Sequence, residues 1–493
     1  MLFTTGTFLF LFLPATLLGF FVTARVCGQA VAAAWLALAS LFFYGYWLPV
    51  YTILLLASVV ANYGFATLIL RQQAALRRAW LIVAITANLV ILAYFKYANF
   101  LLSTANDVAG THFPLLPIIL PLGISFFTFT QIAYLADVYA GKVEQRNPIH
   151  YLLFVTYFPH LIAGPVLHHA EMMPQFAQSE NYLPKLENFV VGFAFLVIGL
   201  AKKILIADSV APVANDAFDN QLSVGIGIGH AWVGTLAYAF QIYFDFSGYS
   251  DMAVGLSLLV GVQLPYNFNS PYKARSIIDF WRRWHMTLSR FLRDYLYFPL
   301  GGNRKGPLRR QVNLLITMLL GGLWHGAAWT FVIWGGLHGT FLALNHGWRF
   351  SRERYSFIRV ALKKPVVAWL WNGIALALTL VCVLIAWVFF RAKNFTTAGA
   401  IVTSMFWQPP GSRMSSHDLG LLPWMAGLGA VVLLLPNSQA LIERLRTILT
   451  RVRVQTRAHE LLAFLAGTEV VAIVLLALIA ARRESTEFIY FNF

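Results

Sequence analysis

Long apolar runs recur along the whole chain, and they constrain its fold more than any other feature. A helix needs roughly 20 mostly apolar residues to cross a membrane. The runs that reach or approach this length are Leu2–Val22, Val31–Trp47, Tyr51–Leu70, Trp80–Phe95, Phe189–Ala207, Ala231–Val260, Val366–Phe390, Leu421–Leu435 and Leu461–Ala480. Shorter runs interrupted by Gly and Pro either cross or re-enter the membrane. We therefore expect an all-α, polytopic membrane protein with about ten to twelve spans.

The composition excludes an ordinary soluble protein. Hydrophobic residues make up 59% of the chain and charged residues 11%, against about 25% charged in a soluble domain. One soluble core cannot bury that much apolar surface. The first apolar run has no basic start and no small-residue cleavage pattern, so we expect a retained helix and no removed signal peptide. We predict a single membrane domain over residues 1–493, in which 486–493 is a C-terminal aromatic tail ending FIYFNF.

The net charge of +16 is concentrated in three polar stretches, which hold 21 of the 36 Lys and Arg residues. These stretches are Lys273–Arg310, Arg349–Lys364 and Arg444–Arg457. The positive-inside rule predicts that they are cytoplasmic loops. No nucleic-acid-binding fold or aromatic–basic pattern accompanies them, so we expect no nucleic-acid partner. The first stretch also suits the phosphates of a donor molecule or of membrane lipid headgroups.

His325 is the strongest candidate for chemistry. It lies between Trp324 and Gly326 in a long apolar stretch with Trp329 close behind. Burial in such a place disfavours the imidazolium and leaves a neutral base near pH 7. A neutral histidine can take the proton of a hydroxyl as that hydroxyl attacks a thioester or ester carbonyl. The alternative is a histidine that is hydrogen-bonded to a helix carbonyl.

Other histidines give weaker signals. His285 lies in an aromatic and basic segment with Arg282, Arg283 and Trp284, and it is either an interfacial residue or a second polar member of the active site. His338 and His346 follow His325 at offsets that match no metal-ligand pattern, and HExxH is absent. His168 and His169 are adjacent, so a regular helix or strand would point them in different directions. We therefore predict no metal site.

A polar cluster interrupts the apolar run around Asp245, Ser247, Ser250 and Asp251. A Ser-His-Asp hydrolase is excluded because the GxSxG elbow and its strand context are missing. Polar residues inside a span are costly to bury without a partner. We therefore interpret the cluster as a buried polar network that supports the site.

A series of motifs extends over nearly the full length. They are FKY at Phe95–Tyr97, PLGISFFTF at Pro121–Phe129, FPHLIAGP at Phe158–Pro165, QIYFDFSGYSDMA at Gln241–Ala253, PYNFNSPY at Pro265–Tyr272, DFWRRWHMTLSRFLRDYLYFPLGG at Asp279–Gly302, GGLWHGAAW at Gly321–Trp329, WGGLHG at Trp334–Gly339 and WVFFRA at Trp387–Ala392. In this order they resemble the membrane-bound O-acyltransferase family, in the branch of the alginate O-acetylation membrane protein and the teichoic-acid D-alanyl transferase.

The resemblance implies packed membrane helices around a funnel or tunnel, with the family's invariant histidine near the narrow point. That histidine corresponds to His325, and the family's second polar position corresponds to His285. Relatives take an acyl group from a cytosolic thioester of coenzyme A or of a carrier protein and deliver it toward the outer face. A separate periplasmic or extracytoplasmic acetyltransferase or esterase-like partner then completes the transfer. The resemblance thus implies a bacterial inner-membrane protein with acetyl-coenzyme A as donor and no bound cofactor.

The C-terminal tail resembles a feature of this branch or of its small companion subunit, in which a tyrosine is proposed to carry the acyl group. That tyrosine corresponds to Tyr490. A free phenol has a pKa of about 10 and is a poor nucleophile, so it would need His325 or His285 as base. The alternative is an aromatic anchor at the membrane interface.

We therefore predict an O-acyltransferase, in the simplest case an O-acetyltransferase, that helps to O-acetylate a cell-envelope polysaccharide such as alginate. His325, His285 and Tyr490 are assigned to catalysis. Donor or substrate contacts are assigned to Arg282, Arg283, Trp284, Trp324, Trp329, Asp245 and Ser247. The rival functions are a long-chain protein or lipid acyltransferase, which needs an apolar acyl tunnel, a transporter, and a non-catalytic scaffold of an export complex. Neither a transporter nor a scaffold would depend on His325.

Overall fold

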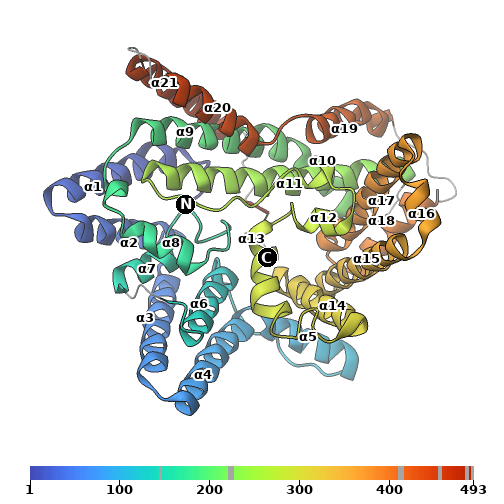
Figure 1. Ribbon diagram of the computed structural model, residues 1–493, viewed down its shortest axis with the longest axis horizontal. Helices are drawn as coiled ribbons and strands as arrows, with labels where there is room; N and C mark the ends of the chain where they lie inside the picture. The colour runs from blue at the N-terminus through green and yellow to red at the C-terminus, as the bar shows by residue number, and fades with distance from the viewer. Residues whose placement is uncertain (144–146, 220–226, 409–415, 453–457, 483–487, 490–493) are drawn as a thin grey trace. The chain divides into compact units, whose positions relative to one another are not determined.

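A computed structural model describes residues 1–493 except 144–146, 220–226, 409–415, 453–457, 483–487 and 490–493 (Figure 1). Every regular element in these described residues is a helix, so the predicted all-α class is confirmed. Backbone contacts divide the chain into two parts. The first consists of Met1–Ile204, Gly248–Tyr266 and Leu441–Asn492, and the second of Leu205–Ser247, Asn267–Ala440 and Phe493. The single domain stays a prediction.

The first part holds the N-terminal helices and the last two helices of the chain. They are η1 (Phe8–Phe12), α1 (Leu13–Val26), α2 (Gln29–Gly45), α3 (Pro49–Arg71), α4 (Ala74–Leu92), η2 (Ala93–Tyr97), α5 (Ala98–Ala109), α6 (Ile124–Tyr139), α7 (Pro148–Thr156), α8 (His169–Phe176), η3 (Ser179–Tyr182), α9 (Leu186–Ala201), α20 (Ser438–Val452) and α21 (Ala458–Arg482). Local signals fix several of these bounds. Pro49 takes the first position of α3, where its missing N–H costs nothing, and the Asn147 side chain caps α7.

Helix α11 (Ile228–Leu259) contributes its second half to the first part, where it packs closely on α9. A Cβ atom added at Gly199 would lie 2.6 Å from the carbonyl oxygen of Gly248. Only glycine permits this backbone approach. Next to it, Lys202 Nζ lies 2.6 Å from Asp251 Oδ2, so the one carboxylate of the sequence cluster that falls in this part is paired.

The second part holds the middle of the chain. Its remaining helices are η4 (Lys202–Ala207, second half), α10 (Asp208–Asp219), η5 (Pro271–Lys273), α12 (Ile277–Trp281), α13 (Met286–Leu292), η6 (Arg293–Tyr297), α14 (Gly306–His325), α15 (Trp329–Arg354), α16 (Ser356–Ala361), α17 (Pro365–Arg391), α18 (Phe395–Phe406) and α19 (Ser416–Leu434). Helices α14 and α15 form a tight hairpin, and α17 packs against α15 and α18.

Six helical stretches of the described chain are long and apolar enough to cross a membrane. They are Phe8–Val26, Pro49–Arg71, Ala74–Ala109, Leu186–Asp219, Pro365–Arg391 and Phe464–Arg482, and the bent pair Asp418–Leu434 and Ser438–Leu449 would make a seventh span. The chain is therefore a multi-pass membrane protein. The count is lower than the ten to twelve spans expected, because helices such as Gln29–Gly45 are shorter. Helix α11, for its part, buries polar side chains including Asp245, Ser247 and Asp251.

Candidate active site

His325 is the last residue of α14 and lies at the turn of the α14–α15 hairpin. Glycines hold the two helices at backbone contact. A Cβ atom at Gly322 would overlap the carbonyl oxygen of Phe331, and one at Gly335 would overlap that of Met318. Helix α14 ends at His325 because Gly326 takes an extended conformation. The hairpin therefore fixes the histidine on rigid backbone.

Aromatic rings surround the His325 side chain, which is 3% exposed. Its ring centroid lies 4.8 Å from that of Trp324, 5.0 Å from that of Trp334 and 5.1 Å from that of Phe390, all in edge-on arrangements. Such walls keep water away from the imidazole ring. The predicted apolar surroundings of His325 are confirmed. Phe390 of α17 also contacts the ring, and no such contact was predicted for it.

His285 lies beside His325, with 6.4 Å between the ring centroids. It is fully buried and links α12 to α13 in a left-handed conformation, φ 43° and ψ 53°. A non-glycine residue in that region carries strain that its surroundings must offset. Phe246 of α11 packs edge-on against the ring at 4.7 Å. The structure thus brings the two predicted histidines together, and it excludes a solvent-exposed interfacial position for His285.

Asn267 orients His285. The Asn267 Oδ1 atom accepts hydrogen bonds from Thr287 N at 3.3 Å and Thr287 Oγ1 at 2.9 Å, and it lies 3.0 Å from His285 Nδ1. An amide oxygen only accepts, so Nδ1 carries the ring hydrogen and Nε2 is the basic nitrogen. Met286 N donates to Asn267 O at 2.9 Å and locks the turn. The motif PYNFNSPY contains Asn267, but its spacing gave no signal for this role.

Burial also sets the charge of His285, which lies outside the six membrane-spanning helices. Desolvation lowers the pKa of His285 to about 3. The ring is therefore neutral at physiological pH, and its Nε2 can accept a proton or a hydrogen bond. A neutral imidazole near a hydroxyl can act as the general base of acyl transfer.

His338 extends the cluster along α15. Trp334 lies between it and His325, with ring centroids 4.8 Å from His338 and 5.0 Å from His325. His338 Nδ1 accepts a hydrogen bond from Trp281 Nε1 at 3.3 Å, and its ring stacks on Phe280 at 6.0 Å. These contacts make His338 a buried support for the aromatic wall. The spacing of His338 from His325 gave no signal for this supporting role.

The predicted donor-binding residues divide into buried and exposed groups. Trp284 is buried, stacked on Phe280 at 5.6 Å and packed on Trp387 at 4.9 Å, so it is part of the wall. Arg283 Nε binds Asp279 Oδ1 at 2.9 Å. Arg282 is exposed, and within the described residues it has no ion pair. Trp329 begins α15 and is 49% exposed.

Asp245 and Ser247 are both buried on α11, on either side of Phe246, which contacts His285. Residues two apart on a helix point to different faces. Ser247 Oγ has no hydrogen-bond partner within the part of the chain that the structure describes. The two side chains therefore flank the Phe246 contact from separate faces of α11, and their role as a supporting network stays a prediction.

Tyr490 lies outside the described residues. Phe488, two residues before Tyr490 in the sequence, is buried in the first part. Its ring lies 4.8 Å from the Tyr249 ring, and Lys203 Nζ lies 4.8 Å from the Phe488 centroid in a cation–π contact. Phe488 is thus a buried aromatic anchor in the first part.

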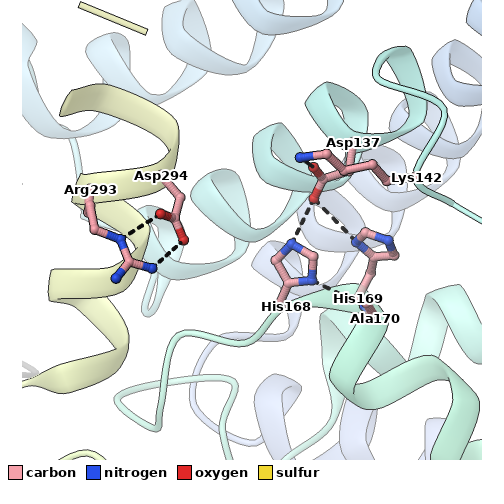
Figure 2. Close-up of polar contacts among 7 residues, drawn as sticks. All are labelled: Asp137, Lys142, His168, His169, Ala170, Arg293 and Asp294. Carbon is pink, nitrogen blue, oxygen red and sulfur yellow. Dashed lines mark hydrogen bonds and ion pairs between the residues drawn. The ribbon is translucent and has the colours of Figure 1, made fainter. Parts of the chain in front are cut away.

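A second polar cluster lies in the first part around Asp137 of α6 (Figure 2). His168 Nε2 and His169 Nδ1 lie 2.8 Å and 3.5 Å from Asp137 Oδ2, and Lys142 Nζ lies 3.4 Å from Oδ1. The expectation that the two rings point apart is wrong, because the extended residue His168 caps α8 while His169 begins it. The three side chains have the composition of a metal site. The absence of a metal stays a prediction, and the contacts shown are those of a polar network in which Asp137 joins α6 to the two histidines at the start of α8.

Comparisons with known proteins agree with the motifs. A model of the membrane-bound O-acyltransferase (MBOAT) family matches residues 17–387. The chain is 44% identical over 432 residues to a peptidoglycan O-acetyltransferase of Helicobacter pylori, covering 82% of this chain and 80% of that protein. It is 42% identical over 415 residues to a probable alginate O-acetylase of Pseudomonas aeruginosa, covering 82% and 75%. A teichoic acid D-alanyltransferase of Bacillus subtilis is 28% identical over 254 residues, covering 48% and 62%.

Proposed function

The chain belongs to the membrane-bound O-acyltransferase family and is an O-acyltransferase, and from this premise we propose that it moves an acetyl group from a cytosolic thioester toward a cell-envelope polysaccharide. The observation that carries the proposal is the buried pair His285 and His325, with ring centroids 6.4 Å apart. The hydrogen bond to Asn267 fixes which nitrogen of His285 is basic.

His325 is the general base in this proposal. It takes the proton of an acceptor hydroxyl while the hydroxyl oxygen forms a bond to the thioester carbonyl carbon. The carbon–sulfur bond then breaks, and the proton passes from His325 to the departing thiolate, which leaves a thiol and an acetyl ester. His285 accepts a hydrogen bond at Nε2 and orients the acceptor hydroxyl. The aromatic wall of Trp324, Trp334 and Phe390 excludes water, which would otherwise hydrolyse the thioester.

Acetyl-coenzyme A is the proposed donor, and an acetylated carrier protein is the alternative. Arg282 is the best candidate to bind the donor's phosphates, because it is exposed and has no ion pair in the described chain. Arg283 is a weaker candidate since Asp279 already neutralises it. Arg282→Gln should therefore raise the KM for the donor, while the amount of protein in the membrane stays unchanged.

Tyr490 is the proposed relay for the acetyl group. Its phenol oxygen would attack the thioester carbonyl with a buried histidine as base, which gives an acetyl-tyrosine and a free thiol. The buried anchor Phe488 supports the proposal because it fixes the chain two residues before the tyrosine. A periplasmic acetyltransferase or esterase-like partner would then carry the acetyl group to the sugar.

The acceptor is proposed to be a cell-envelope glycan, and the location the bacterial inner membrane. The printed names of the relatives support this, since one acetylates peptidoglycan and another is a probable alginate O-acetylase. Both acceptors are polymers that lie beyond the cytoplasmic membrane. The delivery of acetyl groups toward that side therefore fits the multi-pass architecture.

The decisive experiment measures base-releasable acetate on the envelope glycan of cells that carry wild type or His325→Ala at matched membrane levels. His346→Ala is the matched control, because His346 lies on α15 and makes no ring contact with the histidine pair. Loss of acetate in His325→Ala alone supports the proposal. Unchanged acetate would remove His325 from the chemistry and favour a scaffold or a transporter. Release of a long-chain acid in place of acetate would overturn the assigned donor.

A further inference from the structure

A pocket of about 540 Å³ lies in the second part between α15 and α17. Its lining comes from residues 275–277 before and at the start of α12, from α15 between Phe341 and Arg352, and from α17 between Trp371 and Cys382. The volume is in the range of small-molecule sites. None of the residues of the histidine cluster lines it. It is therefore a separate site from the proposed active site.

The walls of the pocket belong to the apolar surface of a membrane span. Helix α17 has 27 residues and is long and apolar enough to cross a membrane. Leu344 of α15 is 65% exposed and Leu378 of α17 is 58% exposed, and both line the pocket. Apolar side chains exposed on the surface of a membrane protein suit contact with lipid acyl chains. An occupant of the pocket thus has an apolar portion that lies along α17.

Three arginines give the pocket a positive lining. They are Arg275, Arg349 and Arg352, and within the described residues none has an ion pair or a hydrogen bond. Helix α15 has one carboxylate, Glu353, and it does not line the pocket. The positive field acts on a neighbour as well: burial, then the charges of Arg310 and Arg349, lower the pKa of His346. An anionic group is the complement of this lining.

Two further features of the lining indicate what the polar portion of the ligand contains. Trp348 of α15 and Trp371 of α17 line the pocket with ring centroids 4.8 Å apart, and tryptophan is enriched at the level of the lipid headgroups. Asn345 Oδ1 is buried in the lining without a hydrogen-bond donor in the described chain. A buried acceptor without a donor is costly, so the ligand is expected to supply a hydroxyl or amine hydrogen.

We propose that this pocket binds an anionic glycerophospholipid with a hydroxylated headgroup, of which phosphatidylglycerol is the simplest case. Its phosphate lies on Arg275, Arg349 and Arg352, its acyl chains lie along α17, and a headgroup hydroxyl donates to Asn345. The positive-inside rule places the Arg349–Lys364 stretch on the cytoplasmic side, where anionic lipids create a negative surface. The site does not depend on acetyl transfer, because none of its residues takes part in the proposed chemistry.

The test uses the full-length protein in lipid nanodiscs of phosphatidylcholine, with and without phosphatidylglycerol. Native mass spectrometry counts retained phosphatidylglycerol, and thermal unfolding measures the stabilisation it gives. We expect wild type to retain the lipid, and the double variant Arg349→Gln/Arg352→Gln to bind it roughly tenfold to thirtyfold more weakly. Arg354→Gln is the matched control, because Arg354 lies on the same helix and does not line the pocket.

A second variant tests the pocket without changing charge. Leu378→Trp adds volume to the lining at an exposed position, so the chain should fold and lose the retained lipid. Equal retention of phosphatidylglycerol by wild type and the double arginine variant would overturn the proposal. Stabilisation by coenzyme A that depends on the arginines, without stabilisation by phosphatidylglycerol, would also overturn it and assign the pocket to a soluble phosphate donor.

Discussion

Asn267 Oδ1 and His285 Nδ1 lie 3.0 Å apart, and this hydrogen bond sets the tautomer of the buried histidine. Thr287 donates to the same oxygen through its backbone N–H and its hydroxyl, so Asn267 Oδ1 is held in place by a second residue. Nε2 is thereby the basic nitrogen of a ring that stands beside His325. Asn267 is a positioning residue, because it acts on the reaction only through His285.

Replacing Asn267 should change kcat with little change in KM. In Asn267→Leu the hydrogen bond is lost and both tautomers of His285 form. We expect kcat to fall by about tenfold to a hundredfold, up to the lower end of the contribution of a general base, because the base stays present in part of the molecules. Asn267→Asp keeps an acceptor for Nδ1–H and should recover most of the activity. Its carboxylate also stabilises the imidazolium and raises the pKa of His285, so the acid limb of the pH–rate profile should move to higher pH. An equal loss in both variants, without a shift of that limb, would reduce Asn267 to a packing residue.

Close packing of α14 on α15 gives a prediction about stability. A Cβ atom at Gly335 would overlap the carbonyl oxygen of Met318, so Gly335→Ala must separate the two helices that position His325 and Trp334. Overpacking of this kind costs about 1–3 kcal/mol, and acetyl transfer should fall with it. Gly347→Ala is the control on the same helix, because a Cβ atom there meets nothing within 4 Å. Alanine favours a helix over glycine by about 1 kcal/mol, so this control should melt at the same temperature or higher. Equal melting temperatures for the two variants would contradict the close contact.

The Asp137 cluster gives a pH dependence. Burial, with the neighbouring His168 and Lys142, outweighs the attraction of Asp137 and lowers the pKa of His169 to about 4. An unfolded histidine has a pKa near 6.5, so between about pH 6.5 and pH 4 the unfolded chain binds the additional proton. Stability is therefore lost as the pH falls through that window. We expect the melting temperature of wild type to fall more between pH 7 and pH 5 than that of His169→Gln, which lacks the titrating ring. Other buried histidines act on both proteins, so the difference between the two curves isolates His169.

The membrane helices were predictable because each is a local pattern. The expected runs Tyr51–Leu70 and Val366–Phe390 differ from α3 and α17 by one or two residues at each end. The expected run Ala231–Val260 likewise corresponds to α11. Because α11 contains several polar residues, it is not among the helices that are apolar enough to cross a membrane. A run of apolar letters fixes the length of a helix, while its polar residues decide whether lipid can surround it.

The details of the site depended on contacts that sequence spacing does not contain. His285 has a left-handed backbone conformation, which no periodic sequence pattern predicts. Its hydrogen bond to Asn267 joins two residues 18 positions apart, and no pattern predicts that contact either. The His168 and His169 rings meet the same carboxylate because a helix begins between them, where the regular alternation of directions fails. Asn267 belongs to the motif PYNFNSPY, and that motif alone did not predict a role for any one of its residues.

The C-terminal tail gives the last prediction, and it separates a relay from an anchor. Phe488 is buried against Tyr249 and Lys203, so Phe488→Ala should loosen the tail and reduce acetylation in part. Tyr490→Phe removes one oxygen and keeps the ring. If Tyr490 carries the acetyl group, this variant loses acetylation completely while its membrane level is unchanged, whereas an anchor would keep full activity in Tyr490→Phe and lose it in Tyr490→Ala.

Mass spectrometry of the C-terminal peptide supplies the direct measurement. The acetyl-tyrosine should be detected in wild type when the periplasmic acceptor is withheld, because the second transfer then cannot occur. It should be absent in His325→Ala if His325 removes the phenol proton, since a phenol with a pKa of about 10 is a poor nucleophile without a base. An acetylated Tyr490 in His325→Ala would mean that His285 or another group is the base for the transfer to Tyr490, and His325 would then not be that base.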